Sequence, residues 1–455
     1  MKRHLKQVTS PLLCGLRSFP ILHWFQDKSI RELFKNVGLL LSGDGTARVL
    51  GLGSLVLTTR ALGAEGFGLL VLANTYARVL DRLFNFQSWQ AIIKYGAEAL
   101  DSKRYEDFKG IIKLGTLLDA SSAVFGSLIA VSAAYWTAKW FGWSQETAHM
   151  AALYSLVILF NLSGTPTGVI RLFERFGLLA TQRVIVAVLK LFAIGAAYFS
   201  DASLWAYVLI WMICDIVGHV ILLVMGYVLL YRKEIGKWWK SPISNWRSFS
   251  SFVFWTNLSS TFDIPVKQLD VFIVSAVVSL EGVGIYKVFK SIADILTKPV
   301  DPVYQAIYPQ FATLVTKGED ARAARMAAKV GLIILVVSIP TVILMSLSSQ
   351  WWLSVIFGDT FASQWLVMNL YLTFKALSIS AVAVHPLFIA MGYVQKNFVI
   401  LATANIIFLI LAWFLCGQFG LAGIILAYGV QFSGVVISKL WCIWAKMRRT
   451  PSLAH

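Results

Sequence analysis

Long apolar segments recur along the whole chain, and they constrain its fold more than any other feature. About twelve runs reach roughly the 20 residues that a helix needs to cross the hydrocarbon core of a bilayer, with short connections between them. Only 14% of the 455 residues are charged, whereas soluble domains carry about 25%. We therefore expect an all-α polytopic membrane protein. The expected spans are about residues 37–58, 67–91, 111–136, 149–170, 178–199, 203–230, 251–279, 284–308, 328–347, 364–390, 397–416 and 420–443.

Lysine and arginine are distributed asymmetrically over the connections. If the N-terminus is placed in the cytoplasm and the sides alternate, the outer loops contain only Arg60 and Lys139, and most other cations outside the spans fall on the inner side. Cytoplasmic loops carry such an excess. The pattern predicts that both termini are cytoplasmic. It also explains the net charge of +17 without a nucleic acid partner.

Two copies of a short motif indicate an internal repeat. The sequences EGFG at 65–68 and EGVG at 281–284 each occupy the outer loop after the first span of their half. Two six-span halves in parallel repeat are a known transporter layout, with the substrate site at their interface. We expect two six-helix halves around a central cavity. The expected organisation is a cytoplasmic N-terminal arm (1–35), a first half (36–230), a cytoplasmic linker (231–250), a second half (251–445) and a cytoplasmic tail (446–455).

Charged residues inside the spans are the candidate functional residues. A charge near the centre of a bilayer costs about 3 kcal/mol on insertion scales, so it normally faces protein or water. In spans two and eight these residues recur every three or four positions, which places them on one helical face. The candidate substrate-binding cations are Arg78, Arg82, Lys190, Lys267, Lys290, Lys298 and Lys375. The candidates for binding a coupling ion are Asp44, Asp81, Asp263 and Asp294.

Some of these charges could instead neutralise each other within one helix. Lys190 and Lys375 have no acid one turn away, which favours a cavity role for both. Asp119 and Asp215 are further acids inside spans. The four cysteines and six histidines show no ligand or disulfide spacing, so neither a metal nor a cofactor is expected. The pairs for which a structural role and an ion-coupling role both remain open are Asp44–Arg48, Arg78–Asp81 and Asp263–Lys267.

Several short motifs, in a fixed order, are similar to those of one known family. TTRALGAEGFGLL (58–70) resembles an R-x-L-G-x-x-x-(F/Y)-G element, and 268–296 resembles a second-half element with Asp270, Gly284 and Tyr286 in typical places. IYPQFATL, FGDTFASQ and FGLAGIILAYGVQ follow later in the chain. This order resembles bacterial polysaccharide flippases of the multidrug/oligosaccharidyl-lipid/polysaccharide exporter superfamily, over about residues 33–445.

The resemblance implies a transporter without catalytic residues rather than an enzyme. Its substrate would be a polyprenyl-diphosphate-linked oligosaccharide, moved from the inner to the outer leaflet of the bacterial cytoplasmic membrane for O-antigen or exopolysaccharide assembly. A proton or sodium gradient could couple the movement. Membrane lipid, a polysaccharide polymerase and assembly proteins would be further partners. Cations in the cavity would suit the anionic diphosphate.

Three other functions remain open from the residues. A multidrug exporter of the same superfamily would carry organic cations, so its cavity should be acidic and aromatic rather than rich in cations. A flippase for peptidoglycan lipid precursors should have two additional spans. A membrane-embedded polysaccharide polymerase or ligase needs a sizeable outer loop, and the longest expected here, about 348–363, is short.

Overall fold

The computed structural model describes residues 28–86, 88–243, 246–261 and 268–449. The regular structure in these ranges is helical throughout. In chain order the elements are α2 (Lys28–Phe84), α3 (Trp89–Asp101), α4 (Tyr105–Phe141), α5 (Gln145–Tyr154), α6 (Val157–Phe160), α7 (Gly164–Leu172), α8 (Phe176–Phe199), α9 (Leu204–Arg232), η2 (Trp238–Lys240), α10 (Trp246–Thr261), α11 (Asp270–Val277), α12 (Leu280–Thr297), η4 (Lys298–Val300), α13 (Asp301–Thr316), α14 (Asp320–Leu347), α15 (Ser349–Phe357), α16 (Asp359–Ala362), α17 (Trp365–Ser380), α18 (Val384–Ala390), α19 (Val394–Phe419) and α20 (Leu421–Arg449).

The helices account for the expected spans, although several spans are broken. Within the described residues, eight helical stretches are long and apolar enough to cross a membrane, and a bent pair, Gln145–Phe160 with Gly164–Leu172, makes a ninth. α2 contains the first expected span and most of the second, and the two meet at Gly63, where the backbone departs from helical geometry (φ 65°, ψ −176°). α10 to α13 divide spans seven and eight into shorter helices. This arrangement confirms the all-α polytopic fold of about twelve spans.

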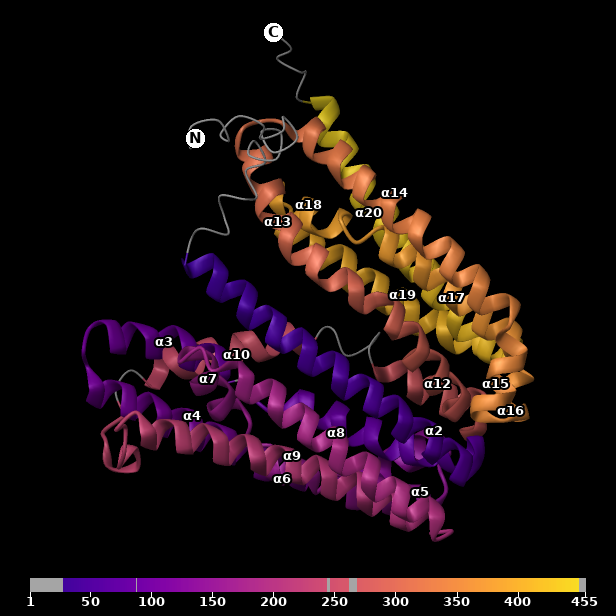
Figure 1. The fold of residues 1–455 in the computed structure, drawn as a ribbon, viewed down its shortest axis with the longest axis horizontal. Coiled ribbons are helices and arrows are strands. Elements are labelled where there is room, and N and C mark those ends of the chain that lie inside the picture. The colour runs from indigo at the N-terminus through magenta and orange to yellow at the C-terminus, as the bar shows by residue number, and fades with distance from the viewer. Residues whose placement is uncertain (1–27, 87, 244–245, 262–267, 450–455) are drawn as a thin grey trace, which may run out of the picture.

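The helices form two groups that diverge from a common end (Figure 1). α2 to α9 make up the first group, and α12 to α20 make up the second, together with α11, which packs on α12 and α19. α2 and α12 pack against each other where the groups converge. α10 begins in the linker that was expected to separate the halves, and it contacts α3 and α2 of the first group.

The expected inner connections all lie at the end where the two groups diverge (Figure 1). They are the connections that follow α3, α7, α9, α13 and α18. Within the described ranges, most of the basic residues outside the helices belong to these connections, so we call this end the basic side. The connections expected outside lie at the converging end, which we call the opposite side.

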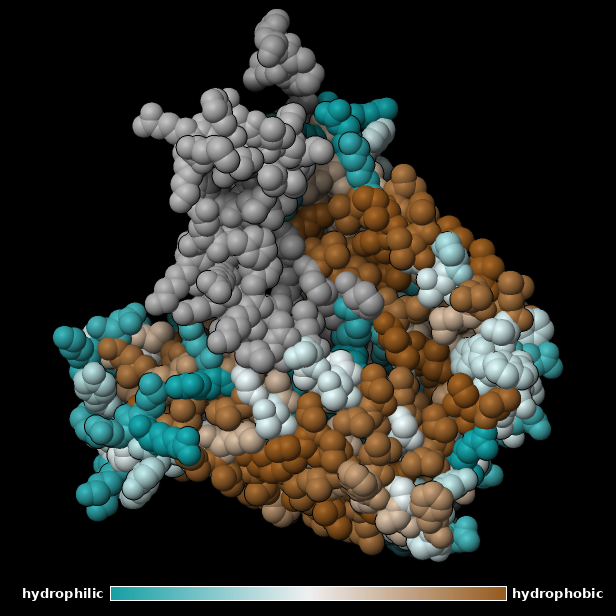
Figure 2. All heavy atoms as spheres, viewed as in Figure 1, coloured by the Kyte–Doolittle hydropathy of each residue, from teal (hydrophilic) through white to brown (hydrophobic). Residues whose placement is uncertain are grey.

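The outer surface of both groups is apolar over its middle. Figure 2 shows hydrophobic side chains there and hydrophilic side chains gathered at the ends. Large apolar side chains such as Phe192, Ile333, Leu344 and Ile410 are exposed by 64% to 74%. Such a surface would be unfavourable in water but matches the hydrocarbon region of a bilayer. The protein is therefore a multi-pass membrane protein.

Candidate functional site

A polar cavity of about 340 Å³ lies among α2, α5, α6, α8 and α9 of the first group. Gln268, two residues before the start of α11, also lines it, so the segment that leads into the second group reaches this space. A polar cavity inside an apolar bundle is the typical surrounding of a transported hydrophilic group. Its polar lining residues are Asn74, Arg78, Asp81, Arg82, Tyr154, Asn161, Gln182, Asp215, His219 and Gln268.

Arg78 and Arg82 are the unneutralised cations of this cavity. They lie one turn apart on α2, and both side chains are exposed. Among the described residues, no carboxylate lies within the 4.0 Å ion-pair distance of either guanidinium, and the intrahelical Arg78–Asp81 pair is not formed. Each guanidinium can therefore donate to an incoming anion, and its planar fork suits two phosphate oxygens at once.

Asp81 is held by amides rather than by a cation. Asn85 donates to its Oδ1 at 3.0 Å, and Asn161 donates to Oδ1 and Oδ2 at 3.0 and 2.8 Å. The carboxylate is therefore hydrogen-bonded without neutralising the positive charge of Arg78 or Arg82. The cavity keeps a cationic wall on α2 even though an acid lies on the same helix.

Asp215 of α9 also lines the cavity and binds two residues of neighbouring helices. It accepts a hydrogen bond from the Tyr154 hydroxyl at 2.7 Å and lies 3.7 Å from Lys190 Nζ. Lys190 also lies 3.7 Å from the centroid of the Trp211 ring, a cation–π distance. Lys190 has no acid one turn away on its own helix, but Asp215 on the neighbouring helix α9 partly neutralises its charge.

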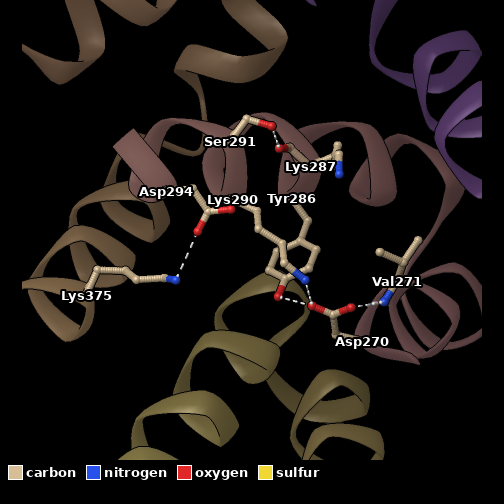
Figure 3. A network of polar contacts seen from close by, with 8 residues as sticks. All are labelled: Asp270, Val271, Tyr286, Lys287, Lys290, Ser291, Asp294 and Lys375. Carbon is tan, nitrogen blue, oxygen red and sulfur yellow. Dashed lines mark hydrogen bonds and ion pairs between the residues drawn. The ribbon is translucent and has the colours of Figure 1, made fainter. Parts of the chain in front are cut away.

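The second group carries a separate buried network around Asp270 (Figure 3). Asp270 is only 1% exposed. Its carboxylate accepts from the Tyr286 hydroxyl at 2.7 Å, from the Val271 backbone amide at 2.9 Å and from Lys290. Lys290, a predicted cavity cation, is thus tied to α11 by a buried ion pair, which stabilises the α11–α12 junction only while both partners are present.

Two other lysines border this network. Lys375 of α17 forms an ion pair with Asp294 at 3.2 Å, and its Nζ lies 5.6 and 5.4 Å from the ring centroids of Tyr371 and Tyr428. Lys287 lies apart from both pairs (Figure 3), and its Nζ has no acid within 4.0 Å in the part of the chain that the structure describes. Lys287 therefore resembles Arg78 and Arg82 in having no acidic partner among the described residues, although its side chain is partly buried.

The remaining predicted residues have different placements. Asp44 pairs with Arg183 of α8, instead of with Arg48 one turn away on its own helix. Lys298 is half-buried at the start of η4. Asp263 and Lys267 lie outside the described residues, so their pairing and their roles stay predictions.

A family model described as "Polysaccharide biosynthesis protein" matches residues 33–315, more than half of the chain. The chain belongs to the polysaccharide biosynthesis protein family. This membership agrees with the resemblance seen in the sequence motifs. A curated relative, "Inner membrane protein YghQ" of Escherichia coli (strain K12), is 24% identical over 303 residues, which are 66% of this chain and 85% of the relative.

The fold of this family member is shared with solved membrane transporters. The structure titled "Lipid II flippase MurJ, inward closed conformation" superposes with a TM-score of 0.68 at 13% identity, covering 89% of this chain and 87% of that one. A "multidrug resistance MATE family transporter of the MOP superfamily", in an inward-facing conformation, superposes with a TM-score of 0.66 at 14% identity, covering 91% and 96%. The expected fold of the exporter superfamily is confirmed.

Several neutral residues of the site were not among the predicted ones. Asn161, Tyr154 and Gln182 line the cavity, and Tyr286 completes the Asp270 network. Charged residues inside apolar spans are rare and therefore stand out in the sequence, whereas single amides or phenols are too common there to do so. The sequence signal that could have indicated Asn161 as the partner of Asp81 is a polar amide in the middle of an otherwise apolar span.

Proposed function

We propose that this family member is a flippase for polyprenyl-diphosphate-linked oligosaccharides. The observation that carries the proposal is the pair of exposed arginines, Arg78 and Arg82, that face a polar cavity inside the membrane without an acidic partner among the described residues. A diphosphate is anionic and presents oxygens in the geometry that guanidinium groups bind. The sugars would fill the polar space while the polyprenyl chain stays in lipid.

The charge distribution supports transport from the inner to the outer leaflet. We place the basic side in the cytoplasm, because cytoplasmic connections carry the excess of lysine and arginine, and this places both termini there. The two groups diverge toward that side (Figure 1), so the substrate enters from the inner leaflet. Rocking of one group against the other then exposes it to the outer leaflet of the cytoplasmic membrane, where O-antigen or exopolysaccharide polymerases and assembly proteins act on it.

The cavity does not favour the export of organic cations. Both of its acids already have donors, since amides hold Asp81, and Tyr154 and Lys190 hold Asp215. The charges left over are positive, and they repel a cationic drug. The MATE-like fold therefore supports the transport mechanism, while the charge of the cavity supports an anionic substrate.

Coupling to a proton or sodium gradient is a further part of this proposal. Asp81 and Asp294 remain candidates, since amides hold the first and Lys375 pairs with the second. Either carboxylate could release these partners to a cation as the two groups move. Asp44 is the weakest candidate, because Arg183 already neutralises it across two helices.

Transport in proteoliposomes tests the anion site. Arg78→Gln and Arg82→Gln should each reduce the appearance of a defined polyprenyl-diphosphate oligosaccharide in the far leaflet, measured with an impermeant lectin. A hydrogen bond to a charged group contributes about 1.5–3 kcal/mol, so the apparent affinity should fall roughly tenfold or more. Arg82→Lys should restore only part of it, because lysine cannot bind two oxygens in a fork.

The matched control is Arg48→Gln, which removes an exposed arginine from the same helix but outside the cavity. It should transport like the wild type. Full transport by the double variant Arg78→Gln/Arg82→Gln, with folded protein in the membrane, would contradict the proposed site.

A further inference from the structure

The two copies of the E-G-x-G motif meet in the structure, although the proposed substrate site uses neither. α2 resumes helical geometry at Ala64, after the break at Gly63, and α12 begins at Leu280. These two residues occupy the same position relative to the motif in each half of the sequence. The motif therefore marks two equivalent helix beginnings, and α2 and α12 pack together at the opposite side.

The second glycine of each copy permits backbone-to-backbone contact between the groups. A methyl group added at Gly68 would overlap the carbonyl of Leu280, with its carbon atom 2.8 Å away, and would lie 3.2 Å from the Gly284 nitrogen. A methyl group added at Gly284 would overlap the carbonyl of Ala64, with its carbon atom 3.0 Å away, and would lie 3.2 Å from the Gly68 nitrogen. The contact is reciprocal, and only glycine fits on either side of it.

The first glycine of each copy makes no such contact. A methyl group at Gly66 would approach side-chain atoms only, 3.1 Å from Leu62 Cβ and 4.0 Å from Leu204. A methyl group at Gly282 would likewise meet only side-chain atoms, of Val278, Ser279 and Leu421. The motif thus contains one glycine that joins the groups and one that does not.

An arginine of the first group caps a helix of the second group beside this crossing. Arg60 Nε donates to the Ile356 carbonyl at 2.9 Å, and its Nη2 donates to the Val355 carbonyl. Both carbonyls belong to the last turn of α15, where helix carbonyls lack intrahelical partners and carry partial negative charge. A cation from one group therefore holds a helix end of the other.

Aromatic contacts complete the closure on the same side. Trp143, in the turn between α4 and α5, donates from Nε1 to Ser275 Oγ at 3.2 Å. The centroid of its ring lies 5.6 Å from that of Phe272, and the Phe141 ring centroid lies 5.5 Å from that of Phe272. Phe272 and Ser275 lie on α11, so the first group contacts the second at three places at this end.

We propose that Gly68 and Gly284 form the gate that closes the opposite side, with Arg60 as its latch. Opening that side separates α2 from α12 at the glycine crossing and withdraws Arg60 from the end of α15. The crossing suits a reversible gate because the backbones of α2 and α12 approach too closely at the two glycines to admit a methyl group, so separating the helices there breaks van der Waals contacts that are individually weak. The gate rests on the alternating-access part of the proposed function and does not depend on the identity of the substrate.

Distances between spin labels test the gate without any substrate. In a background with the four native cysteines replaced by serine, one pair of labels at Gln145 and Gln418 reports on the opposite side, and another at Ser102 and Gln395 reports on the basic side. All four positions are exposed. Double electron–electron resonance in nanodiscs should show that Gly68→Ala lengthens the first distance and shortens the second. Gly284→Ala should shift both distances in the same directions.

Gly66→Ala is the matched control, since it adds the same methyl group two residues away from the crossing glycine, and it should keep the wild-type distances. Arg60→Gln removes the latch without adding volume, so it should shift part of the population in the direction of Gly68→Ala. Wild-type distances in folded Gly68→Ala and Gly284→Ala would overturn the gate. If neither alanine variant folds, Arg60→Gln decides, and unchanged distances in it would overturn the proposal. Loss of transport by the cavity variants would leave these results unaffected.

Discussion

Asp44 and Arg183 form an ion pair between α2 and α8, with side chains 30% and 42% exposed. The pair neutralises two charges inside an apolar bundle and joins neighbouring helices. Lys375 and Asp294 do the same between α17 and α12. Charged residues inside this protein thus fall into two kinds, those that tie helices together and those, such as Arg78 and Arg82, that remain available to a ligand.

If Asp44 has only this structural role, its removal should be compensated by removal of its partner. Asp44→Asn and Arg183→Gln alone should each lower the apparent melting temperature in detergent, by the equivalent of about 1 kcal/mol, since the pair is partly exposed. The double variant should recover most of the loss and should keep gradient-driven uptake in proteoliposomes. A double variant that folds and still exchanges substrate passively, but no longer responds to a gradient, would instead identify Asp44 as the coupling site.

The sequence placed Arg78, Asp81 and Arg82 on one helical face, but it did not predict the partners of the charged residues. Intramembrane charge is rare, so Arg78, Arg82 and Asp81 stand out and do meet in one cavity. Helical spacing suggested Arg48 as the partner of Asp44, but the partner is Arg183, 139 positions away in the chain. Such pairs depend on which helices are neighbours in the bundle, and the pattern of one span contains no information about that.

Asp119 joins three helices at two breaks in the first group. It lies on α4 and is fully buried. Its carboxylate accepts from Ser88 Oγ at 2.6 Å, just before α3, and from the backbone amide and hydroxyl of Thr165 at 2.6 and 2.8 Å, at the start of α7. Amides in the first turn of a helix have no intrahelical acceptor, and Asp119 supplies one from another helix. This intramembrane acid therefore serves the fold.

Asp119→Ala should destabilise the protein. It leaves the Ser88 hydroxyl and the Thr165 amide without their acceptor in a buried place, at a cost of about 1–3 kcal/mol for each unsatisfied group. The apparent melting temperature should fall clearly, and transport should fall only as far as folded protein is lost. Ser121→Ala is the control, because this exposed hydroxyl donates only to the Leu118 carbonyl of its own helix. An unchanged melting temperature for Asp119→Ala would contradict the structural role.

Two helix breaks in the first group were not predicted from the sequence. Residues 67–91 and 149–170 were expected as continuous spans, but helices end at Phe84 and Phe160 and resume at Trp89 and Gly164. Hydropathy measures whether a segment can cross the membrane, and it does not register interruptions. The breaks are stabilised by Asp119 and by the Asp81–Asn161 bonds, which come from residues distant in the chain.

At the scale of the whole molecule, hydropathy predicted the all-α polytopic fold, and the charge pattern predicted which connections lie on the same side. The basic connections share one side, because each span reverses the direction of the chain (Figure 1). The boundaries proposed for the two halves and the linker remain predictions. From the repeat, we expected the two E-G-x-G copies at equivalent outer positions. Their contact at Gly68 and Gly284 depends on how the helices pack, which the sequence pattern alone does not show.

The accessibility of the cavity from each side tests orientation and shape together. A single cysteine in place of Arg82, in a background without native cysteines, should react with an impermeant maleimide in inside-out vesicles and be protected in right-side-out vesicles, because the groups diverge toward the basic side. Ser102→Cys should be labelled only in inside-out vesicles and Gln418→Cys only in right-side-out vesicles. Both positions are exposed; Ser102 directly follows α3 on the basic side, and Gln418 lies in the last turn of α19 on the opposite side. Protection of Arg82→Cys from both sides would contradict a water-accessible cavity. Reversed labelling of all three would show that the basic side faces outward.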